Sequence, residues 1–232
     1  MSDAQHHQDV AHVREQVAQV RARIADAAMR AGRDASEVAL VAVTKTVPVA
    51  LAAAALDAGV RELGENRAQD LVAKATALAS RSPAPRWHFI GRLQRNKVRS
   101  LAPHVALWES IDRAELVTEL EHRAPGARVL VQVNLAGEAQ KGGCAPEEVP
   151  ALVESATAAG LDVVGLMTVP PLADDPRPHF ARVRALAASL GLRELSMGMS
   201  GDYEVAVEEG ATIVRVGTAL FGPRRAPNGL RR

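Results

Sequence analysis

A lysine ends one of the most apolar stretches of this 232-residue chain. The run VALVAVTK is hydrophobic as far as Val43 and closes on Thr44 and Lys45. An amine at the end of a buried strand is partly desolvated, which lowers its pKa and makes the neutral form available. A neutral amine attacks aldehydes and forms a Schiff base. Lys45 is therefore a candidate nucleophile. The alternative is a lysine whose stem packs on apolar surface while its ammonium group reaches water.

Hydroxyl groups and glycines gather in two later stretches, GMSG and VGTALFG, which contain Ser200, Gly217 and Thr218. Exposed backbone N–H groups and the start of a helix supply aligned donors for a phosphate group. These three residues predict a phosphate site. The alternative is that the glycines only permit tight turns and the hydroxyls only cap helices.

An arginine interrupts the apolar run ATIVRVGT. Because side chains alternate along a strand, Arg215 points away from the face that carries Val214 and Val216. If that face lines the interior of a barrel, the guanidinium needs an acceptor there, such as a ring nitrogen, a phosphate or a carboxylate. A salt bridge to Glu62 or Glu65 is the structural alternative.

Eight β-rich runs, each followed by a helix or turn, must position these groups. They are VALVAVTK, VRELGEN, WHFIG, ALWESI, RVLVQVN, DVVGLMTV, ELSMGMS and ATIVRVGT. Alternation of strand and helix implies parallel strands, and eight such units in roughly 200 residues or more predict a closed (β/α)8 TIM barrel. An open doubly wound sheet is the alternative, but no G-x-G-x-x-G follows the first run.

The same pattern predicts a single domain over residues 1–232. It comprises an extra N-terminal helix at about 9–31, the barrel at about 38–222 and a basic tail at 223–232. Active sites of such barrels lie at the C-terminal ends of the strands. Residues that end the runs, Lys45 among them, should therefore meet at one mouth.

Composition excludes several classes of function. The net charge is +1, from 28 basic and 27 acidic residues, so we expect no nucleic acid partner. No window approaches the roughly 20 apolar residues that span a bilayer, and we expect a cytoplasmic protein without a membrane partner. A single cysteine, Cys144, cannot form an internal disulfide. The histidines show no metal-binding spacing, so we expect no metal; His88, in a strand near the cavity, is the exception worth testing.

Seven motifs carry a resemblance to a known family. They are VAVTKTVP, ELGENRAQD, WHFIGRLQRNK, VNLAGEAQKGG, GLMTVPP, LSMGMSGDYEVAVEEG and VRVGTALFG. Together they resemble the pyridoxal phosphate homeostasis proteins, also described as proline synthase co-transcribed homologues. The resemblance covers residues 38–222, essentially the whole predicted barrel.

The resemblance implies a barrel similar to the N-terminal domain of fold-type III pyridoxal phosphate enzymes such as alanine racemase. It implies that Lys45 holds pyridoxal 5'-phosphate covalently as a Schiff base and that Ser200, Gly217 and Thr218 bind the phosphate. It also implies that Arg215 faces the pyridine nitrogen.

By the same resemblance, Asn66 of the GEN motif lies near the cofactor. The chain departs from the family pattern in two places. Arg92 follows Gly91 where the family often carries an uncharged residue, and the basic tail has no counterpart. Neither departure touches the implied cofactor contacts.

Two features favour a carrier over an enzyme. A guanidinium can only donate hydrogen bonds, so Arg215 favours an unprotonated ring nitrogen and weakens the cofactor as an electron sink. A two-base racemase also needs a second acid-base group, and the single tyrosine, Tyr203, is expected at a helix start. We expect no second domain beyond Arg232 to close the site.

The sequence therefore predicts a monomeric pyridoxal phosphate-binding protein of vitamin B6 homeostasis and supply, without strong catalysis and with no catalytic residue. Pyridoxal phosphate-dependent apoenzymes are the protein partners that this function suggests. Two alternatives stay open: an amino-acid racemase of the alanine racemase type, and a Schiff-base aldolase acting on a sugar phosphate through Lys45.

Overall fold

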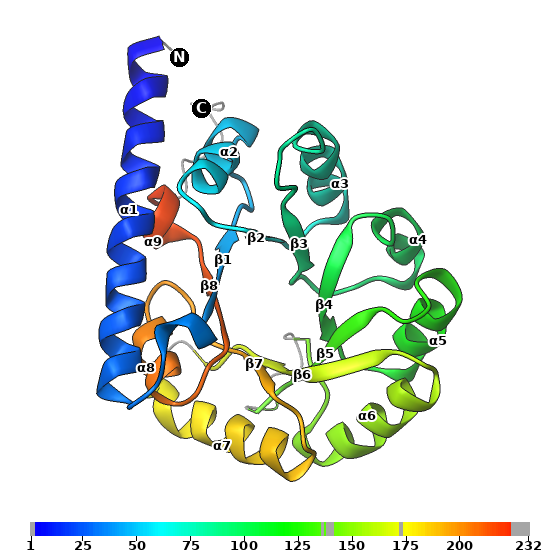
Figure 1. Ribbon diagram of the computed structural model, residues 1–232. Coiled ribbons are helices and arrows are strands. Elements are labelled where there is room, and N and C mark those ends of the chain that lie inside the picture. Colours follow the sequence, from blue (N-terminus) through cyan, green and yellow to red (C-terminus); the bar gives the residue numbers. More distant parts are fainter. Residues whose placement is uncertain (1–2, 136, 138–141, 172–173, 224–232) are drawn as a thin grey trace, which may run out of the picture.

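Parallel strands close on themselves in sequence order in the computed structural model, which describes residues 3–135, 137, 142–171 and 174–223 (Figure 1). The strands are β1 (Ala39–Val43), β2 (Glu62–Glu65), β3 (Arg86–Phe89), β4 (Val105–Ile111), β5 (Arg128–Val133), β6 (Asp162–Thr168), β7 (Glu194–Ser196) and β8 (Ile213–Val216). β8 pairs with β1 from Ala39 to Ala42, which completes the ring. The predicted (β/α)8 barrel is confirmed. The predicted basic tail lies outside the described residues after Pro223.

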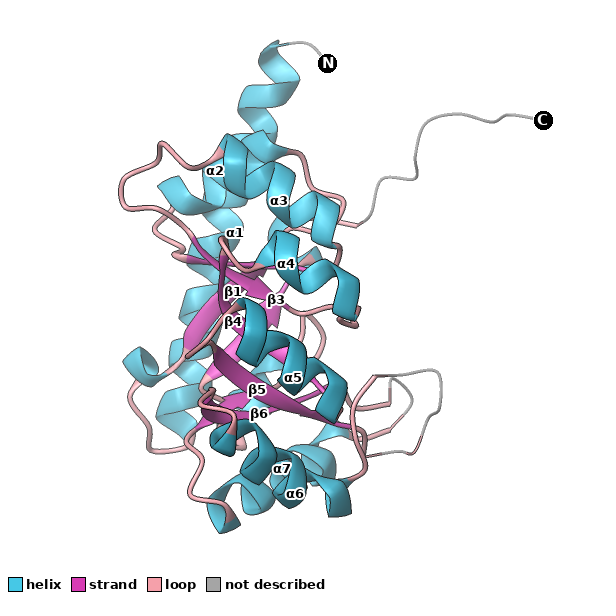
Figure 2. Cartoon of the chain, turned by 90° about the vertical axis from the view of Figure 1, so that its right-hand side faces the viewer, coloured by secondary structure: helices cyan, strands magenta, loops and turns pink. Residues whose placement is uncertain are grey.

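Helices cover the outside of the strands (Figure 2). Among the described residues the α-helices are α1 (Asp3–Arg30), α2 (Val49–Asp57), α3 (Ala68–Ala77), α4 (Val98–Leu101), α5 (Ala114–Arg123), α6 (Val149–Ala158), α7 (Pro176–Ser189), α8 (Tyr203–Glu208) and α9 (Thr218–Phe221). Single turns of 3-10 helix precede β1, α4 and α6 at Ala35–Glu37, Arg95–Lys97 and Pro146–Glu148. None of the described helices is both long and apolar enough to cross a bilayer.

Side-chain alternation divides the apolar residues into two layers. The inner layer fills the barrel and consists of Val41, Leu107, Leu130, Met167 and Ile213. The outer layer packs between strands and helices and includes Leu40 and Ala42, the neighbours of Val41 on β1. The strands are hydrophobic on both faces because both faces are buried.

The N-terminal helix α1 lies along one side of the barrel against α2, α8 and α9 (Figure 1). Its buried stripe has helical spacing, with Val13, Val17, Val20 and Ile24 each at most 4% exposed. The predicted extra helix is confirmed, although it begins earlier than expected, at Asp3.

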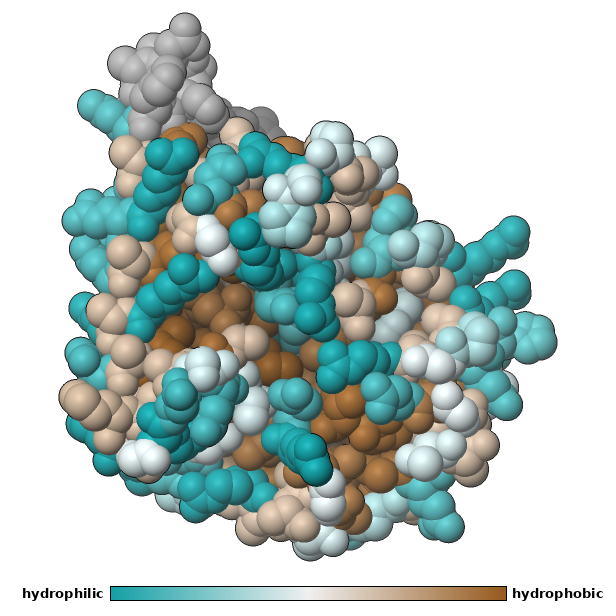
Figure 3. All heavy atoms as spheres, in the orientation of Figure 1, coloured by the Kyte–Doolittle hydropathy of each residue, from teal (hydrophilic) through white to brown (hydrophobic). Residues whose placement is uncertain are grey.

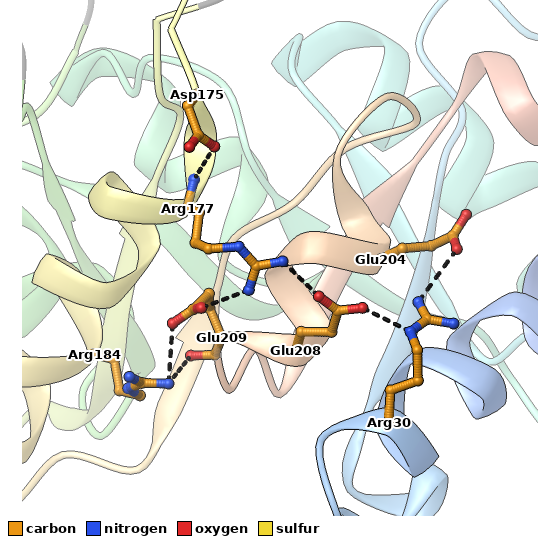
Figure 4. Close-up of polar contacts among 7 residues, drawn as sticks. All are labelled: Arg30, Asp175, Arg177, Arg184, Glu204, Glu208 and Glu209. Carbon is orange, nitrogen blue, oxygen red and sulfur yellow. Dashed lines mark hydrogen bonds and ion pairs between the residues drawn. The ribbon is translucent and has the colours of Figure 1, made fainter.

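Ion pairs fasten the end of α1 to α8, and α8 to α7 (Figure 4). Arg30 Nε donates to Glu208 at 2.8 Å, and Arg177 Nη2 of α7 donates to the same carboxylate at 2.6 Å. Arg177 also reaches Glu209 at 2.8 Å. These pairs are partly exposed and add little stability, because solvent screens them.

Polar side chains cover much of the face that Figure 1 presents, and hydrophobic residues come into view in recesses between them (Figure 3). Among the described residues, the large hydrophobic side chains that remain exposed are Met29 and Val49.

Candidate functional site

Lys45 lies two residues beyond the C-terminal end of β1, at the mouth of the barrel. Val41 belongs to the inner apolar layer, so alternation along β1 directs Lys45 to the same inner side. The lysine is half-buried. Thr46, the next residue, has φ +64°, a left-handed conformation that is uncommon for a β-branched side chain. Such strain persists only where surrounding contacts hold the backbone.

Those contacts come from a buried cluster between β2 and α3. Lys74 Nζ donates to the carbonyl oxygen of Thr44 at 2.5 Å and to Glu65 Oε1 at 2.5 Å. The hydroxyl of Thr44 donates to the same carboxylate oxygen at 2.7 Å. The residue before Lys45 is therefore fixed through its backbone and its side chain, which restricts the turn that presents the amine.

One cavity of about 200 Å³ joins the end of β1 to the end of β8. Lys45, Gly217 and Thr218 line it together, as the predicted convergence of strand ends requires. Asp9 and His12 of α1 form part of the opposite wall. The structure thus brings the predicted nucleophile and two of the predicted phosphate ligands to the same space.

Ser200 connects the turns that follow β7 and β8. Its hydroxyl oxygen accepts hydrogen bonds from the backbone N–H groups of Gly217 at 3.1 Å and Ala219 at 3.3 Å. The turn before Ser200 depends on Gly198, which has φ +92° and whose added Cβ would lie 2.5 Å from the Cβ of Ala206. The Ser200 hydroxyl, which accepts both bonds and keeps its own proton, therefore lies at the start of α9, where the sequence predicts a phosphate site.

Arg215 projects into the barrel interior and is 4% exposed. Its Nη1 donates to the Ser196 hydroxyl at 2.6 Å, and its Nη2 donates to the carbonyl oxygen of Thr168 at 2.8 Å. Glu109 Oε2 lies 3.8 Å from Nη1 and supplies the opposite charge. Burial lowers the pKa of Arg215, and the Glu109 carboxylate opposes that change.

The two carboxylates named from the sequence as structural partners of Arg215 are both engaged elsewhere. Glu65 points out of the barrel and pairs with Lys74. Glu62 starts β2 and pairs with His88 at 2.9 Å. The sequence therefore correctly suggested a glutamate as the partner of Arg215, but the two residues that it named are wrong. The carboxylate beside the guanidinium is that of Glu109 on β4.

Asn66 lies apart from the Lys45 cavity. It is exposed and lines a second cavity of about 250 Å³ together with Arg67, Phe89 and Arg92. The backbone carbonyl of Asn66 passes so close to Gly91 that an added Cβ there would lie 2.1 Å from it. This approach explains the glycine of WHFIG. A contact between Asn66 and a cofactor stays a prediction.

Sequence reasoning missed Glu109 and Ser196, and left His88 without a role. The signal for Glu109 was available, because it stands two positions after Leu107, an inner-layer residue, and so faces inward. Ser196 is the last residue of β7, and its inward direction becomes evident only from its bond to Arg215. Across the described ranges, no group of three or more histidine, cysteine, aspartate or glutamate side chains could hold a metal ion.

The Lys45 amine and the residues at the start of α9 share one cavity, whereas the buried guanidinium of Arg215 lies in the barrel interior and is not among the residues that line that cavity. Only two N–H groups of Arg215 are used by the bonds to Ser196 and Thr168, out of the five that a guanidinium carries. The guanidinium therefore carries further N–H groups beyond those in these two bonds. A compound with an aldehyde, an aromatic nitrogen and a phosphate fits this donor set.

Comparison with known proteins finds relatives along nearly the whole chain. Residues 10–225 match the family model described as alanine racemase, N-terminal domain. The pyridoxal phosphate homeostasis protein of Pseudomonas aeruginosa is 46% identical over 222 residues, covering 91% of this chain and 96% of the relative. The protein of the same name from Aquifex aeolicus is 43% identical, with 91% and 98% covered.

Solved structures also include a relative that aligns along most of this chain. PipY of Synechococcus elongatus is 33% identical, and each of its two structures covers 90% of this chain and 100% of that one. The TM-score is 0.80 for the structure without pyridoxal phosphate and 0.77 for the structure with pyridoxal phosphate bound.

Proposed function

This chain belongs to the alanine racemase N-terminal domain family and to its pyridoxal phosphate homeostasis proteins, and on that premise we propose that it binds pyridoxal 5'-phosphate and serves its intracellular supply. The observation that carries the proposal is the shared cavity of Lys45, Gly217 and Thr218. Its lining supports the proposal because the Lys45 amine and two candidate phosphate ligands share one small volume. PipY, a relative that aligns over 90% of this chain and 100% of its own, has been solved with this cofactor bound.

Each part of the cofactor has a proposed counterpart. Lys45 holds the aldehyde carbon covalently as a Schiff base. Ser200, Thr218 and the amide of Gly217 hold the phosphate, and Arg215 meets the pyridine nitrogen. Asn66, which lies just after β2 and lines the second cavity, is the remaining proposed contact. When bound, the cofactor supplies an aldehyde whose reactivity the protein restrains.

The arrangement supports storage and delivery more than turnover. Arg215 is held permanently charged by Glu109, so it donates toward the ring nitrogen and does not protonate it. Tyr203 is 3% exposed on α8, which leaves it poorly placed as a mobile acid. His12 of α1 lines the Lys45 cavity and is the group that a weak side activity would use.

Pyridoxal phosphate-dependent apoenzymes are the proposed recipients, and the proposed working form is a monomer in the cytoplasm. The monomer is supported by the surface, where few large hydrophobic side chains among the described residues stay exposed.

Spectroscopy of the purified protein tests the binding proposal. Titration with pyridoxal phosphate should produce a visible absorbance band that saturates at one cofactor per chain. Lys45→Ala and Lys45→Arg should both lack the band, because arginine keeps the charge but forms no stable Schiff base. A wild-type band that survives in both variants would refute the proposed linkage.

Turnover measurements separate the alternatives. Sustained racemisation of alanine or serine at rates near 1–10³ per second, the ordinary range for enzymes, would make the protein a racemase. Cleavage of a sugar phosphate in the absence of the coenzyme would make it an aldolase. The proposed carrier shows neither, and it restores activity to a cofactor-free apoenzyme in proportion to the cofactor it carries.

A further inference from the structure

A continuous chain of polar contacts runs through the barrel interior from Arg215 to Glu62. Ser196 Oγ accepts from Arg215 at 2.6 Å and donates to Glu109 Oε2 at 2.5 Å. Glu109 Oε1 lies 2.5 Å from His88 Nδ1, and His88 Nε2 lies 2.9 Å from Glu62 Oε2. The five residues come from β8, β7, β4, β3 and β2, so the chain exists only when the barrel is closed.

This row of polar contacts reaches solvent at the end of the barrel opposite the cavity. Glu62 and Arg86 are the first residues of β2 and β3, and Arg86 Nε lies 3.5 Å from Glu62 Oε1. The Arg86 side chain is 54% exposed. A row of contacts therefore links the outer end of the barrel to the guanidinium beneath the mouth.

Charges alternate along this row when His88 is protonated. Arg215 is positive, Glu109 negative, His88 positive and Glu62 negative, so each buried charge has an opposite neighbour and their sum is zero. Burial alone would lower the pKa of His88, but hydrogen bonds and attraction from Glu109 and Glu62 raise it to about 9. The imidazolium is therefore the form present at neutral pH. The carboxylate of Asp202 also acts on Arg215 from the start of α8.

Glu109 contacts three members of this row and lies at its centre. It is fully buried, and its oxygens are used by His88 and Ser196. Without it, Arg215 would keep the Thr168 carbonyl as an acceptor but would lose its counterion. Removing one partner of a buried ion pair leaves the other charge uncompensated, which is strongly unfavourable. The guanidinium would then move or share its charge with a ligand.

We infer that Glu109, acting with Ser196 and His88, positions the guanidinium of Arg215 and limits how much of its positive charge reaches a bound cofactor ring. The inference rests on the proposed function for the identity of the ligand, and on the contacts from Arg215 to Glu62 for the row of polar residues. Glu109, Ser196 and His88 are positioning residues, because they act through Arg215.

The pH titration of the visible absorbance of the cofactor-loaded protein tests this role. In Glu109→Gln the uncompensated guanidinium disfavours a proton on the bound cofactor, so the midpoint should fall by about one pH unit, with weaker cofactor binding. Ser110→Ala is the matched control. Ser110 is the next residue on β4, is buried, and its hydroxyl has no partner, so the midpoint should stay at the wild-type value.

A second variant covers the case in which Glu109→Gln does not fold. Ser196→Ala removes only the bridging hydroxyl and should shift the midpoint in the same direction by a smaller amount. Nuclear magnetic resonance of the cofactor-free protein gives a second readout. The His88 imidazole should titrate near pH 9 in the wild type and at lower pH in Glu109→Gln, which removes a carboxylate that raises its pKa.

The outcomes separate the two proposals. If the variants bind cofactor and titrate with the wild-type midpoint, the positioning role is wrong and the proposed function stands. If the wild type shows no cofactor absorbance, the proposed function fails, and the imidazole titration alone decides whether the buried chain behaves as inferred.

Discussion

The hydroxyl of Ser200 accepts a hydrogen bond from the backbone N–H of Gly217 at 3.1 Å. This bond joins the turn after β7 to the turn after β8, which are separate in sequence and adjacent at the mouth of the barrel. The amide and the hydroxyl are thereby ordered before any ligand arrives. The hydroxyl accepts in this bond and keeps its own proton, and a donor ordered in this way loses little conformational freedom when an anion binds.

Removing this hydroxyl should weaken cofactor binding. In Ser200→Ala the phosphate loses a donor and the amide of Gly217 loses the atom that orients it, so the dissociation constant for pyridoxal phosphate should rise about tenfold. Equilibrium titration of absorbance measures it. Ser100→Ala, on an exposed turn of α4, is the control. Equal affinities in the two variants would exclude Ser200 from the phosphate site.

The buried pair of Lys74 and Glu65 should be a major stabilising element next to Lys45. Lys74→Met leaves the Glu65 carboxylate buried without a counterion, and Glu65 Oε2 already has no hydrogen-bond partner among the described atoms. We expect a loss of about 3–5 kcal/mol in the free energy of unfolding, measured by urea denaturation. The double variant with Glu65→Gln should recover part of it. A double variant less stable than Lys74→Met would contradict this account.

The protonation of His88 predicts how stability depends on pH. Its pKa is raised from 6.5 to about 9 in the folded protein, so its contribution is fully present below pH 6.5 and is lost as pH rises through 9. The raised pKa corresponds to about 3 kcal/mol of unfolding free energy. Denaturation across this pH range measures it. In His88→Gln the free energy of unfolding should decrease less between pH 6.5 and 9 than in the wild type. An equal decrease in the two proteins would assign the pH dependence to other groups.

Cys144 should be unreactive in the folded protein. It is 6% exposed, and burial raises the pKa of its thiol to about 11. The thiolate is the nucleophile, so alkylation by iodoacetamide at pH 8 should be about 100-fold slower than in the unfolded chain. Mass spectrometry of native and denatured samples checks this. Equal rates would place the thiol in an open environment.

The barrel was predictable because its strands are short apolar runs that end in polar or glycine residues. VALVAVTK predicted both β1 and the position of Lys45, since local hydrophobicity sets the strand and its last residue marks the mouth. The N-terminal helix was predictable for a similar reason, from its stripe of valines. Its start was not, because the first turn of a helix carries little pattern.

The partners of Arg215 were not predictable from the chain alone. Alternation indicated that Arg215 faces inward, but which carboxylate it meets depends on the relative register of β4 and β8, which lie across the barrel. The sequence suggested Glu62 or Glu65 as the partner of Arg215. In the structure these carboxylates pair with His88 and Lys74 instead. The chain from His88 to Ser196 likewise depends on closure of the ring, which no local pattern encodes.

The covalent link between Lys45 and pyridoxal phosphate is the central claim, and borohydride reduction followed by peptide mapping tests it most directly. Reduction of the cofactor-loaded protein should fix one pyridoxyl phosphate group per chain on the peptide that contains Lys45. Lys74, Lys97 and Lys141 should remain unmodified. A label on another lysine, or no label on a protein that still binds the cofactor, would contradict the account.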